Sequence, residues 1–208
     1  MLINMTLDEF LTEAASATPA PGGGSVSALV GALGAALTSM VCELTTEKDA
    51  DQATLAQVAQ AKTEALALMD SLKQAVDRDT QVFNKVMDAY RMPKATDEEK
   101  QRRSAAIQNS LKEAADEPCR AAELSLEVMK KAHIMLKIGN KNAASDAAVA
   151  GLLAHAALHG ALYNVKINIG VIKDAEYVSS MKLRSDSLIA ESDQLLVSLK
   201  TLAAEIIG

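Results

Sequence analysis

The sequence predicts an all-α protein, an antiparallel bundle of five to six long helices. Hydrophobic residues make up 49% of the 208 positions, yet aromatic residues make up only 2% and tryptophan is absent. The core is therefore expected to consist mainly of Ala, Leu, Val and Met. Apolar residues recur at spacings of three and four through most of the chain, and no stretch shows the two-residue period of a strand.

The length and charge of the chain limit its organisation and its partners. A chain of 208 residues can bury one large core, so we expect a single helical domain over residues 1–208. Long helices often offer a second apolar face to a partner, which predicts a homodimer. The net charge is −6 with acidic and basic residues interspersed, which argues against a nucleic-acid partner. The sequence also contains no run of basic residues that would indicate binding to a membrane surface.

The cysteines and the N-terminus indicate the compartment. Cys42 and Cys119 lie far apart in helical patterns, which favours two reduced, buried thiols over a disulfide framework. The N-terminus has no basic region followed by an apolar stretch, so no signal peptide is expected. The uncharged run over residues 26–42 spans 17 positions and is interpreted as a core helix, not a membrane span. We therefore expect a cytoplasmic protein.

The first two predicted helices flank a glycine-rich loop. Thr6 and Glu9 form a capping box, which predicts a short helix over residues 7 to about 16. The loop reads Pro-Ala-Pro-Gly-Gly-Gly-Ser over residues 19–25, and Ser25 is expected to cap a buried central helix. In that helix the larger apolar residues follow one helical stripe. Small residues at 27, 31, 35 and 39 form a strip that lets a neighbouring helix come close.

Four more helices are expected after the central one. A polar turn at 45–51 precedes a helix over about 52–91, which the sequence Met92-Pro93-Lys94 ends. A second capping box, from residue 96 to residue 99, starts a helical pattern that Gly139 ends as a C′ residue. Within this pattern Pro118 either kinks one helix or separates two. An alanine-rich helix over about 145–171 and a helix over about 174–207 follow.

Two carboxylates lie on stripes that are otherwise apolar. Asp79 interrupts the stripe of the helix over residues 52–91, and a buried carboxylate is costly unless it is paired. It is either an ion-paired or solvated seam residue or a functional acid in a cleft. Asp146 heads the stripe of the alanine-rich helix, where stabilisation of the helix dipole is the alternative. Lys94 alone indicates only a solvated loop lysine.

The glycine loop and several asparagines are candidate binding groups. Glycines let a backbone approach a ligand closely, and exposed amides at a helix start attract anions. The loop lacks the Gly-Lys-Ser/Thr of a Walker loop and follows no strand, as a dinucleotide fingerprint must. Asn140, Asn142, Asn164 and Asn168 supply amides that suit heterocycle edges, although amides also cap and bridge helices.

The histidines give no clear indication of a metal site. His155 and His159 are four residues apart, a spacing that can hold a metal, but no Glu lies between them in the metalloprotease pattern. No third ligand is evident from the sequence. His133 stands alone. We therefore interpret all three as core or surface histidines and expect no metal.

These features together resemble the cyclodeaminase/cyclohydrolase family. That family includes the C-terminal half of the bifunctional formiminotransferase-cyclodeaminase and stand-alone bacterial methenyltetrahydrofolate cyclohydrolases. The matching segments are residues 19–25 with the small-residue helix, Asp79 with Phe83, Val86 and Met87, residues 91–96, Gly139-Asn140 with Ser145-Asp146, and residues 164–168. The resemblance implies an all-helical homodimer that binds a folate substrate with no metal or other cofactor.

The resemblance leaves two reactions open. One is hydrolysis of 5,10-methenyltetrahydrofolate to 10-formyltetrahydrofolate, and the other is cyclisation of 5-formiminotetrahydrofolate with loss of ammonia. Both pass through a tetrahedral carbon that bridges N5 and N10 and need proton transfer to a departing nitrogen. The chain carries no formiminotransferase half, which favours the cyclohydrolase of one-carbon metabolism. A non-catalytic folate-binding helical dimer is the alternative from another class.

The expected roles follow from the chemistry of the cationic methenyl carbon. Asp79, with Asp146 second, is expected to stabilise the cation or to accept the proton of the attacking water. Lys94 is expected to protonate N5 or to hold the developing oxygen charge. The remaining residues are expected to bind the substrate, through the backbone of the loop or through side chains that contact the ring: Gly22, Gly23, Gly24, Ser25, Asn140, Ser145 and Asn164.

Overall fold

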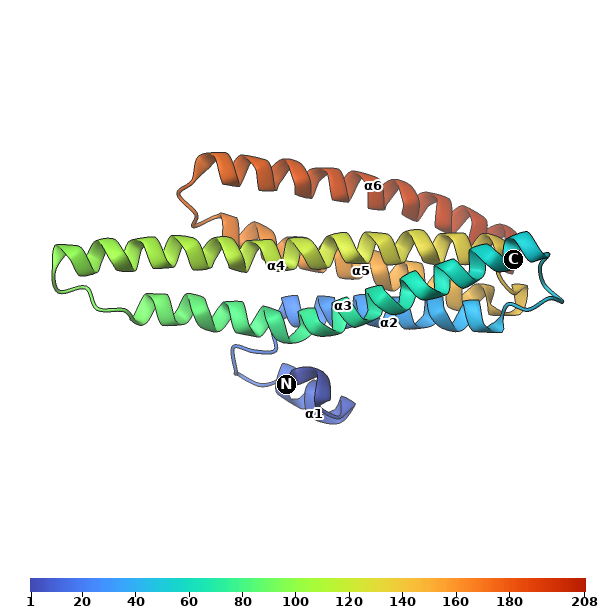
Figure 1. The fold of residues 1–208 in the computed structure, drawn as a ribbon, viewed down its shortest axis with the longest axis horizontal. Helices are drawn as coiled ribbons and strands as arrows, with labels where there is room; N and C mark the ends of the chain where they lie inside the picture. The colour runs from blue at the N-terminus through green and yellow to red at the C-terminus, as the bar shows by residue number, and fades with distance from the viewer.

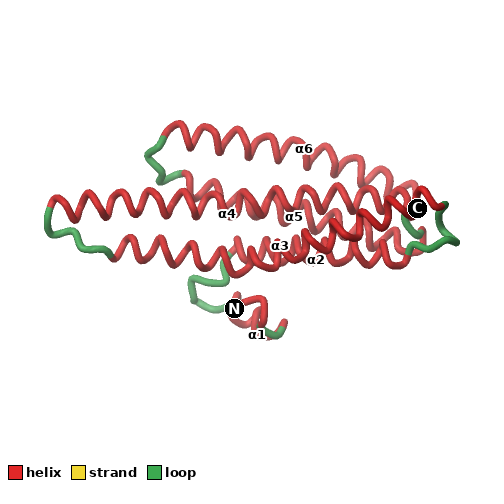
Figure 2. The backbone as a smooth tube through the Cα atoms, viewed as in Figure 1, coloured by secondary structure: helices red, strands yellow, loops and turns green.

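The computed structural model describes residues 1–208 and contains six α-helices and no strand. The helices are α1 (Leu7–Ala14), α2 (Gly23–Leu44), α3 (Gln52–Arg91), α4 (Asp97–Ile138), α5 (Ala144–Ile169) and α6 (Ala175–Ile207), with short 3-10 helices at Leu2–Asn4 and Lys141–Ala143. Successive long helices run in opposite directions (Figure 1), which confirms the predicted antiparallel bundle. The loops are confined to the ends of the helices (Figure 2).

The helices α2, α3, α4 and α5 form the centre of the bundle. In Figure 1 the helices α2 and α5 lie behind α3 and α4, and α6 covers the edge formed by α4 and α5. The hairpin of α3 and α4 extends beyond the other helices at one end. The start of α2 lies beside Asp79, so slightly less than the last third of α3 continues past it.

Local sequence signals explain most helix boundaries. Both capping boxes are present: the side chains of Thr6 and Thr96 accept from the backbone amides of Glu9 and Glu99, respectively. The helix α3 ends at Arg91, directly before Met92 and Pro93, as predicted. Of the two alternatives at Pro118, the structure has one continuous helix with the proline inside it.

The prediction for Gly139 was partly wrong. This glycine ends α4, but it is the C-cap residue with φ −79° and ψ −179°, an extended conformation open to any residue. A Cβ at this position would lie 2.5 Å from the carbonyl oxygen of Met135 and 3.1 Å from Cγ1 of Val41. The carbonyl group of Met135 in the last turn of α4, and then Val41 of α2, leave no room for a Cβ here, and a left-handed turn does not explain the glycine.

The helix α2 differs from the prediction in two ways. It begins at Gly23 with Gly22 as its N-cap, so Ser25 lies in the first turn and is not the cap. The small-residue strip is buried, as predicted: a Cβ on Gly31 would lie 2.9 Å from Oγ of Ser125. The larger stripe, however, is not the buried face. Four of its members, Val26, Leu33, Met40 and Leu44, are exposed, Leu33 by 50%, whereas Val41 near the end of the helix is fully buried.

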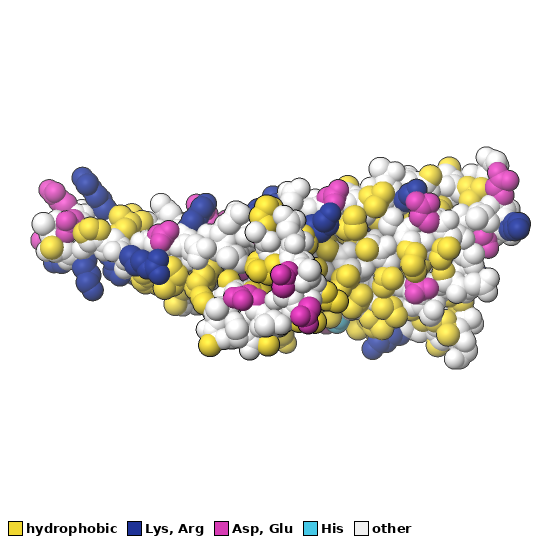
Figure 3. Space-filling model, turned by 90° about the horizontal axis from the view of Figure 1, so that it is seen from below, with side chains coloured by type: hydrophobic (Ala, Val, Ile, Leu, Met, Phe, Trp, Pro, Cys, Tyr) yellow, Lys and Arg dark blue, Asp and Glu magenta, His cyan; other side chains and the backbone are white.

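The reversed burial of α2 follows from packing distance. Three helices, α3, α4 and α5, surround one side of α2 and lie too close for large side chains there. The large apolar residues must then face outward, where no element of this chain covers them. Exposed hydrophobic side chains also gather beside α1 on the face that Figure 3 shows.

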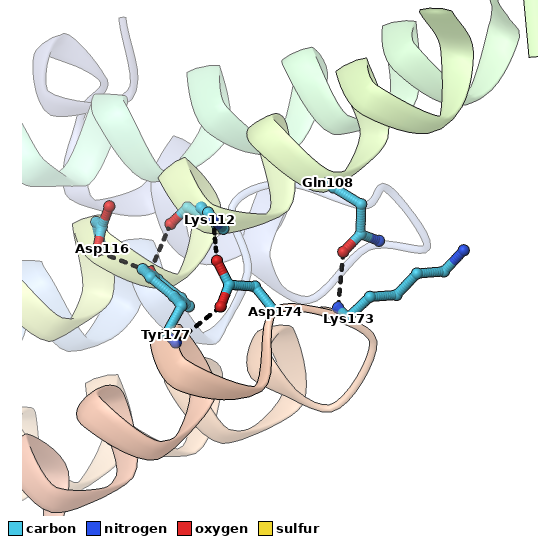
Figure 4. A network of polar contacts seen from close by, with 6 residues as sticks. All are labelled: Gln108, Lys112, Asp116, Lys173, Asp174 and Tyr177. Carbon is cyan, nitrogen blue, oxygen red and sulfur yellow. Dashed lines mark hydrogen bonds and ion pairs between the residues drawn. The ribbon is translucent and has the colours of Figure 1, made fainter. Parts of the chain in front are cut away.

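The last helix is fixed to α4 by a polar network (Figure 4). Asp174 caps α6 through the amide of Tyr177, and its other oxygen lies 2.6 Å from Nζ of Lys112. The Tyr177 hydroxyl donates to Oδ1 of Asp116 at 2.8 Å. The amide of Lys173 donates to Oε1 of Gln108 at 2.7 Å. Burial and the bond to Asp116 raise the pKa of Tyr177, so it stays a neutral donor.

Two further sequence features can be compared with the fold. Cys42 and Cys119 are free and buried, as predicted, and burial raises the pKa of each thiol to about 11. Two segments, Gly23–Leu44 and Lys141–Ile169, are long and apolar enough to cross a membrane by length and composition alone. Of their most apolar windows, 61% and 50% are buried inside the fold, and core helices of soluble proteins pass the same test.

Candidate active site

The carboxylate of Asp79 lies against the first turn of α2. Its Oδ2 accepts a hydrogen bond from the amide of Ser25 at 2.9 Å and lies 3.0 Å from the Ser25 hydroxyl oxygen. That hydroxyl is also 2.9 Å from the carbonyl oxygen of Val76 on α3, so Ser25 joins the two helices. The first turn of α2 contains no acidic residue of its own. Asp79 therefore supplies the negative charge that the positive end of the helix dipole favours.

Gly24 makes this close approach possible. A Cβ at position 24 would lie 2.1 Å from Oδ1 of Asp79 and 2.8 Å from its Oδ2. Real Cβ contacts are essentially never shorter than 3.0 Å, so any larger residue here would displace the carboxylate. Gly23 differs, because its Cβ would meet only Asn164, with Nδ2 at 3.4 Å. Of the three consecutive glycines, Gly24 is therefore the one that allows the contact with Asp79.

The environment of Asp79 disfavours its charged form. Burial raises the pKa of the carboxyl above its usual value, hydrogen bonds from Ser25 lower it, and the negative charge of Glu117 raises it further. Glu117 itself pairs with Arg78 at 2.7 Å, and Asp79 forms no ion pair. The sequence left open whether Asp79 is paired with a basic side chain of a neighbouring helix, and this alternative is therefore wrong. A half-buried carboxylate with a raised pKa at the wall of a pocket is a candidate for proton exchange with a bound molecule.

Asp79 lines a pocket of about 340 Å³ between the glycine loop, α3 and α5. The lining residues are Pro19, Ala20, Gly22, Gly23, Gly24, Asp79, Thr80, Val82, Phe83, Val86, Met87, Tyr90, Ala114, Asn164 and Asn168. The rings of Phe83 and Tyr90 are partly exposed and provide flat apolar surface. The pocket thus combines one carboxylate with apolar walls and two side-chain amides.

The two asparagines of α5 are oriented by backbone carbonyls. Nδ2 of Asn164 donates to the carbonyl oxygen of Gly160 at 2.9 Å, and Nδ2 of Asn168 donates to that of Ala114 at 2.6 Å. In this amide assignment both Oδ1 atoms remain as acceptors for a ligand. The sequence named Asn168 as a candidate amide without assigning it a substrate contact, and Thr80 was not predicted. The spacing of four from Asn164 is the signal that points to Asn168, whereas no signal in the sequence points to Thr80.

The glycines at the start of α2 belong to the lining of the same pocket. Gly23 and Gly24 are the first two residues of α2, where amides have no acceptor within the helix. Both residues line the pocket. They can therefore donate to a carbonyl or carboxylate oxygen of a bound molecule, with the helix dipole behind them.

The other predicted site residues lie elsewhere in the chain. Lys94 is in the loop after α3, exposed and without a hydrogen bond, beyond the residues that line the pocket. Asn140, Ser145 and Asp146 lie at the opposite end of α2 from Gly23. Nδ2 of Asn140 donates to the carbonyl oxygen of Leu44, the last residue of that helix, at 2.8 Å.

The length of α2 separates the two groups. From Gly23 to Leu44 the helix rises by about 32 Å. Within one chain, therefore, the structure brings Asp79, the glycine loop and Asn164 together, and it does not bring Asn140, Ser145 or Asp146 to them.

Comparison with known proteins identifies relatives of this chain. The sequence profile described as formiminotransferase-cyclodeaminase matches residues 6–187. A methenyltetrahydrofolate cyclohydrolase from Methylorubrum extorquens is 40% identical over 192 residues, which cover 92% of each protein. The formimidoyltransferase-cyclodeaminase of Rattus norvegicus is 33% identical over 210 residues, and the chain spans 37% of its length.

A solved structure has the same fold. The crystal structure of formiminotetrahydrofolate cyclodeaminase from Thermotoga maritima matches with a TM-score of 0.89 and 28% sequence identity, and the match covers 100% of both chains. The family profile matches most of the sequence, and the relatives match nearly all of it. This confirms the resemblance that the motifs indicate, and the chain belongs to the formiminotransferase-cyclodeaminase family.

Proposed function

We propose that this protein hydrolyses 5,10-methenyltetrahydrofolate to 10-formyltetrahydrofolate. The observation that carries the proposal is the half-buried Asp79 carboxylate, which has a raised pKa and is held by Ser25 at the wall of a partly apolar pocket. The relative from Methylorubrum extorquens, named for this reaction, is similar over nearly the whole length of both chains. The proposed location is the cytoplasm.

The proposed mechanism uses Asp79 as a proton acceptor and donor. The methenyl group is a cationic amidinium, which a nearby carboxylate stabilises. Water adds to its carbon, and Asp79 takes one proton of that water. The bond between the carbon and N5 then breaks, and protonated Asp79 gives its proton to N5. The hydroxyl proton leaves as the formyl group forms on N10, so the net reaction consumes water and releases one proton. Water is the only co-reactant, and this scheme needs no cofactor.

The pocket residues hold the substrate in this scheme. The amides of Gly23 and Gly24 bind a carbonyl or carboxylate oxygen of the folate. Asn164 and Asn168 accept from the amino and ring N–H groups of the pterin through their Oδ1 atoms. Phe83 and Tyr90 pack against the flat ring system. Lys94 contacts the substrate only if the substrate extends beyond the pocket, or if the lysine comes from another copy of the chain.

A matched pair of aspartate variants tests the proposal. Asp79→Asn keeps the shape of the side chain and removes the proton acceptor, so kcat for loss of the methenyl absorbance should fall by at least about 100-fold. Asp88→Asn is the control, because Asp88 lies on the same helix, is exposed and does not line the pocket. Near-normal turnover by Asp79→Asn would rule out this mechanism.

The second candidate function is the cyclodeaminase reaction. It is favoured by the similarity to the rat and Thermotoga proteins, and it uses the same bridged carbon and the same proton transfers. Incubation with 5-formiminotetrahydrofolate distinguishes the two. Ammonia release with growth of the methenyl absorbance would identify a cyclodeaminase, whereas rapid methenyl hydrolysis with little ammonia release supports the cyclohydrolase. Neither reaction from a folded protein would leave the non-catalytic folate binder.

The proposed active form is a homodimer built on the outer face of α2 and α5. These helices pack side by side, and both expose apolar residues away from the bundle. The exposed members are Val26, Leu33, Met40 and Leu44 on α2, and Val149, Leu152, Tyr163 and Ile167 on α5. An apolar surface that follows the length of two helices is typical of an interface between copies.

A two-fold axis across the middle of α2 would join the separated site residues. The two α2 helices then run in opposite directions, so the start of one lies near the end of the other. Asn140 of the partner subunit and Asp146 of the partner subunit would approach the pocket that Asp79 lines. This arrangement gives Asn140, Ser145 and Asp146 the substrate contacts expected of them.

Introduction of a charge and subunit mixing test the dimer. Leu33→Lys places a charge in the proposed interface and should give the mass of a single chain in light scattering, whereas Leu183→Lys, on exposed α6, should keep the dimer. Mixing and reassociating Asp79→Asn with Asp146→Asn should recover about a quarter of wild-type activity, since half of the dimers then contain one intact site of two. A monomeric wild type, or no recovery, would contradict the shared site.

A further inference from the structure

A second cluster of reactive side chains lies between α5 and α6. His155 and His159 extend from α5, and Asp193 extends from α6. The ligand atoms of these three residues lie within 4.8 Å of one another. The Nε2 atoms of His155 and His159 are 2.9 Å and 3.1 Å from the same oxygen, Oδ1 of Asp193. Three side chains from two helices thus direct their ligand atoms at one point.

The helical geometry explains the convergence. Residues four apart lie one turn apart on the same face of a helix, so both imidazoles of α5 face α6. Their ring centroids are 4.3 Å apart. The third member, Asp193, lies on the next helix and 34 residues after His159, which is why no third ligand is evident in the sequence. The structure supplies that ligand as Asp193.

We propose that His155, His159 and Asp193 bind one divalent transition-metal ion of the zinc type. Two imidazole nitrogens and one carboxylate oxygen are a ligand set that zinc accepts, with its fourth position left to water. A neutral imidazole can carry its proton on Nδ1, which frees the Nε2 lone pair for the metal. Asp193 contributes its Oδ1 atom, which both Nε2 atoms already face at 2.9 Å and 3.1 Å.

The surroundings leave the site open to solvent. The side chains of His155 and His159 are 20% and 27% exposed, so an ion can enter without unfolding of the bundle. His159 also lines a groove of about 280 Å³ between α5 and α6, together with Lys166, Lys182 and Asp186. This groove shares no lining residue with the pocket of Asp79. The metal site is therefore separate from the proposed catalytic site.

The ion would act as a clamp on α6. Only four residues of this helix are buried, Met181, Leu188, Ser192 and Leu199, whereas α4 contributes sixteen to the core. The start of α6 is tied to α4 by the network of Asp174 and Tyr177. Asp193 lies in the second half of the helix, where a metal bridge to α5 would supply a second fixed point.

Zinc titration of the purified, metal-stripped protein tests the proposal. Calorimetry should show one Zn²⁺ bound per chain. The variants His155→Asn, His159→Asn and Asp193→Asn should each lower the affinity at least about tenfold, since even indirect partners of a metal site contribute that much. His133→Asn is the matched control: its Nε2 also contacts α6, at 2.9 Å from Oγ of Ser198, but no carboxylate is present there.

Two further measurements distinguish this site from metal binding by a cysteine thiolate or by scattered surface groups. Co²⁺ should give only the weak visible bands of nitrogen and oxygen ligands. Intense near-ultraviolet bands of sulfur ligation would assign the ion to Cys42 or Cys119 and overturn the proposal. Zinc at about 100 times its Kd should raise the Tm of the wild type by several degrees, and of His133→Asn equally. No saturable binding by the wild type, or unchanged binding by all three ligand variants with normal circular dichroism, would also refute the site.

Discussion

Replacement of Gly24 by alanine tests whether the position of Asp79 controls activity. The added Cβ would lie 2.1 Å from Oδ1, 2.6 Å from Cγ and 2.8 Å from Oδ2 of Asp79. A carbon and an oxygen that are not bonded keep about 3.3 Å between them, so the carboxylate oxygen must retreat by roughly 1 Å. The backbone of α2 cannot move away easily, because Ser25 ties it to Val76 at 2.9 Å. The displacement must therefore occur mostly in Asp79.

The expected effect is a large loss of activity with little loss of stability. A misplacement of about 1 Å can cost about 100-fold in rate, so kcat/KM of Gly24→Ala on 5,10-methenyltetrahydrofolate should fall by about that factor. Alanine is the better helix former by up to about 1 kcal/mol, which offsets part of the strain in the free energy of unfolding.

A neighbouring glycine provides the control. Gly23→Ala places its Cβ 3.4 Å from Asn164, an ordinary contact, and should retain activity within a few fold. The assay is the decay of the methenyl absorbance, with urea unfolding of each variant. Wild-type kcat/KM in Gly24→Ala, or equal losses in both variants, would refute the reasoning.

Three further predictions concern the same region. Burial raises the pKa of Asp79 in the folded state, so above pH 3.8 the native state binds more protons than the unfolded state. The free energy of unfolding therefore falls as the pH rises from 3.8 through the folded-state pKa. Urea unfolding should show Asp79→Asn to be more stable than the wild type at pH 7, with no difference well below pH 3.8. Ser25→Ala removes the hydroxyl near Val76 and Asp79 and should cost about 1 kcal/mol in the same measurement. Leu72→Ala should cost about 2–5 kcal/mol, because Leu72 is fully buried against Gly31; a cost below 1 kcal/mol would contradict that packing.

The sequence was sufficient for the fold because its signals were local. Capping residues, prolines and apolar periodicity each act within a few residues, and they predicted the bounds of α3 and both capping boxes correctly. Periodicity could not decide which stripe of α2 faces inward. That depends on how closely three other helices approach, and the small strip allowed a distance at which only small residues fit. The N-cap was misplaced because Ser25 has a better partner in another helix, Asp79.

The site was predictable only where one helix face carries it. Asp79 stood out because a carboxylate interrupts an apolar stripe, and Asn164 because it repeats at a spacing of four with Asn168. Gly24 and Asp79 are 55 residues apart in the sequence, and a single sequence gives no indication that they are in contact. Likewise, the motif around Asn140 and Asp146 gives no indication that it lies at the other end of α2.

The two faces of α2 link the site to the proposed assembly. The small face lets α3 come close enough for Asp79 to reach the first turn of α2, and the same geometry excludes the large apolar side chains to the outside. If the large apolar residues of α2 also faced inward, α3 could not come close enough for the contact between Gly24 and Asp79. If α2 had no exposed apolar residues, it would lose its surface for a second copy. Gly24→Ala and Leu33→Lys act on these faces separately. The first should lower kcat/KM by about 100-fold in a protein that still dimerises. The second should abolish the dimer while Ser25 still holds Asp79 in each chain.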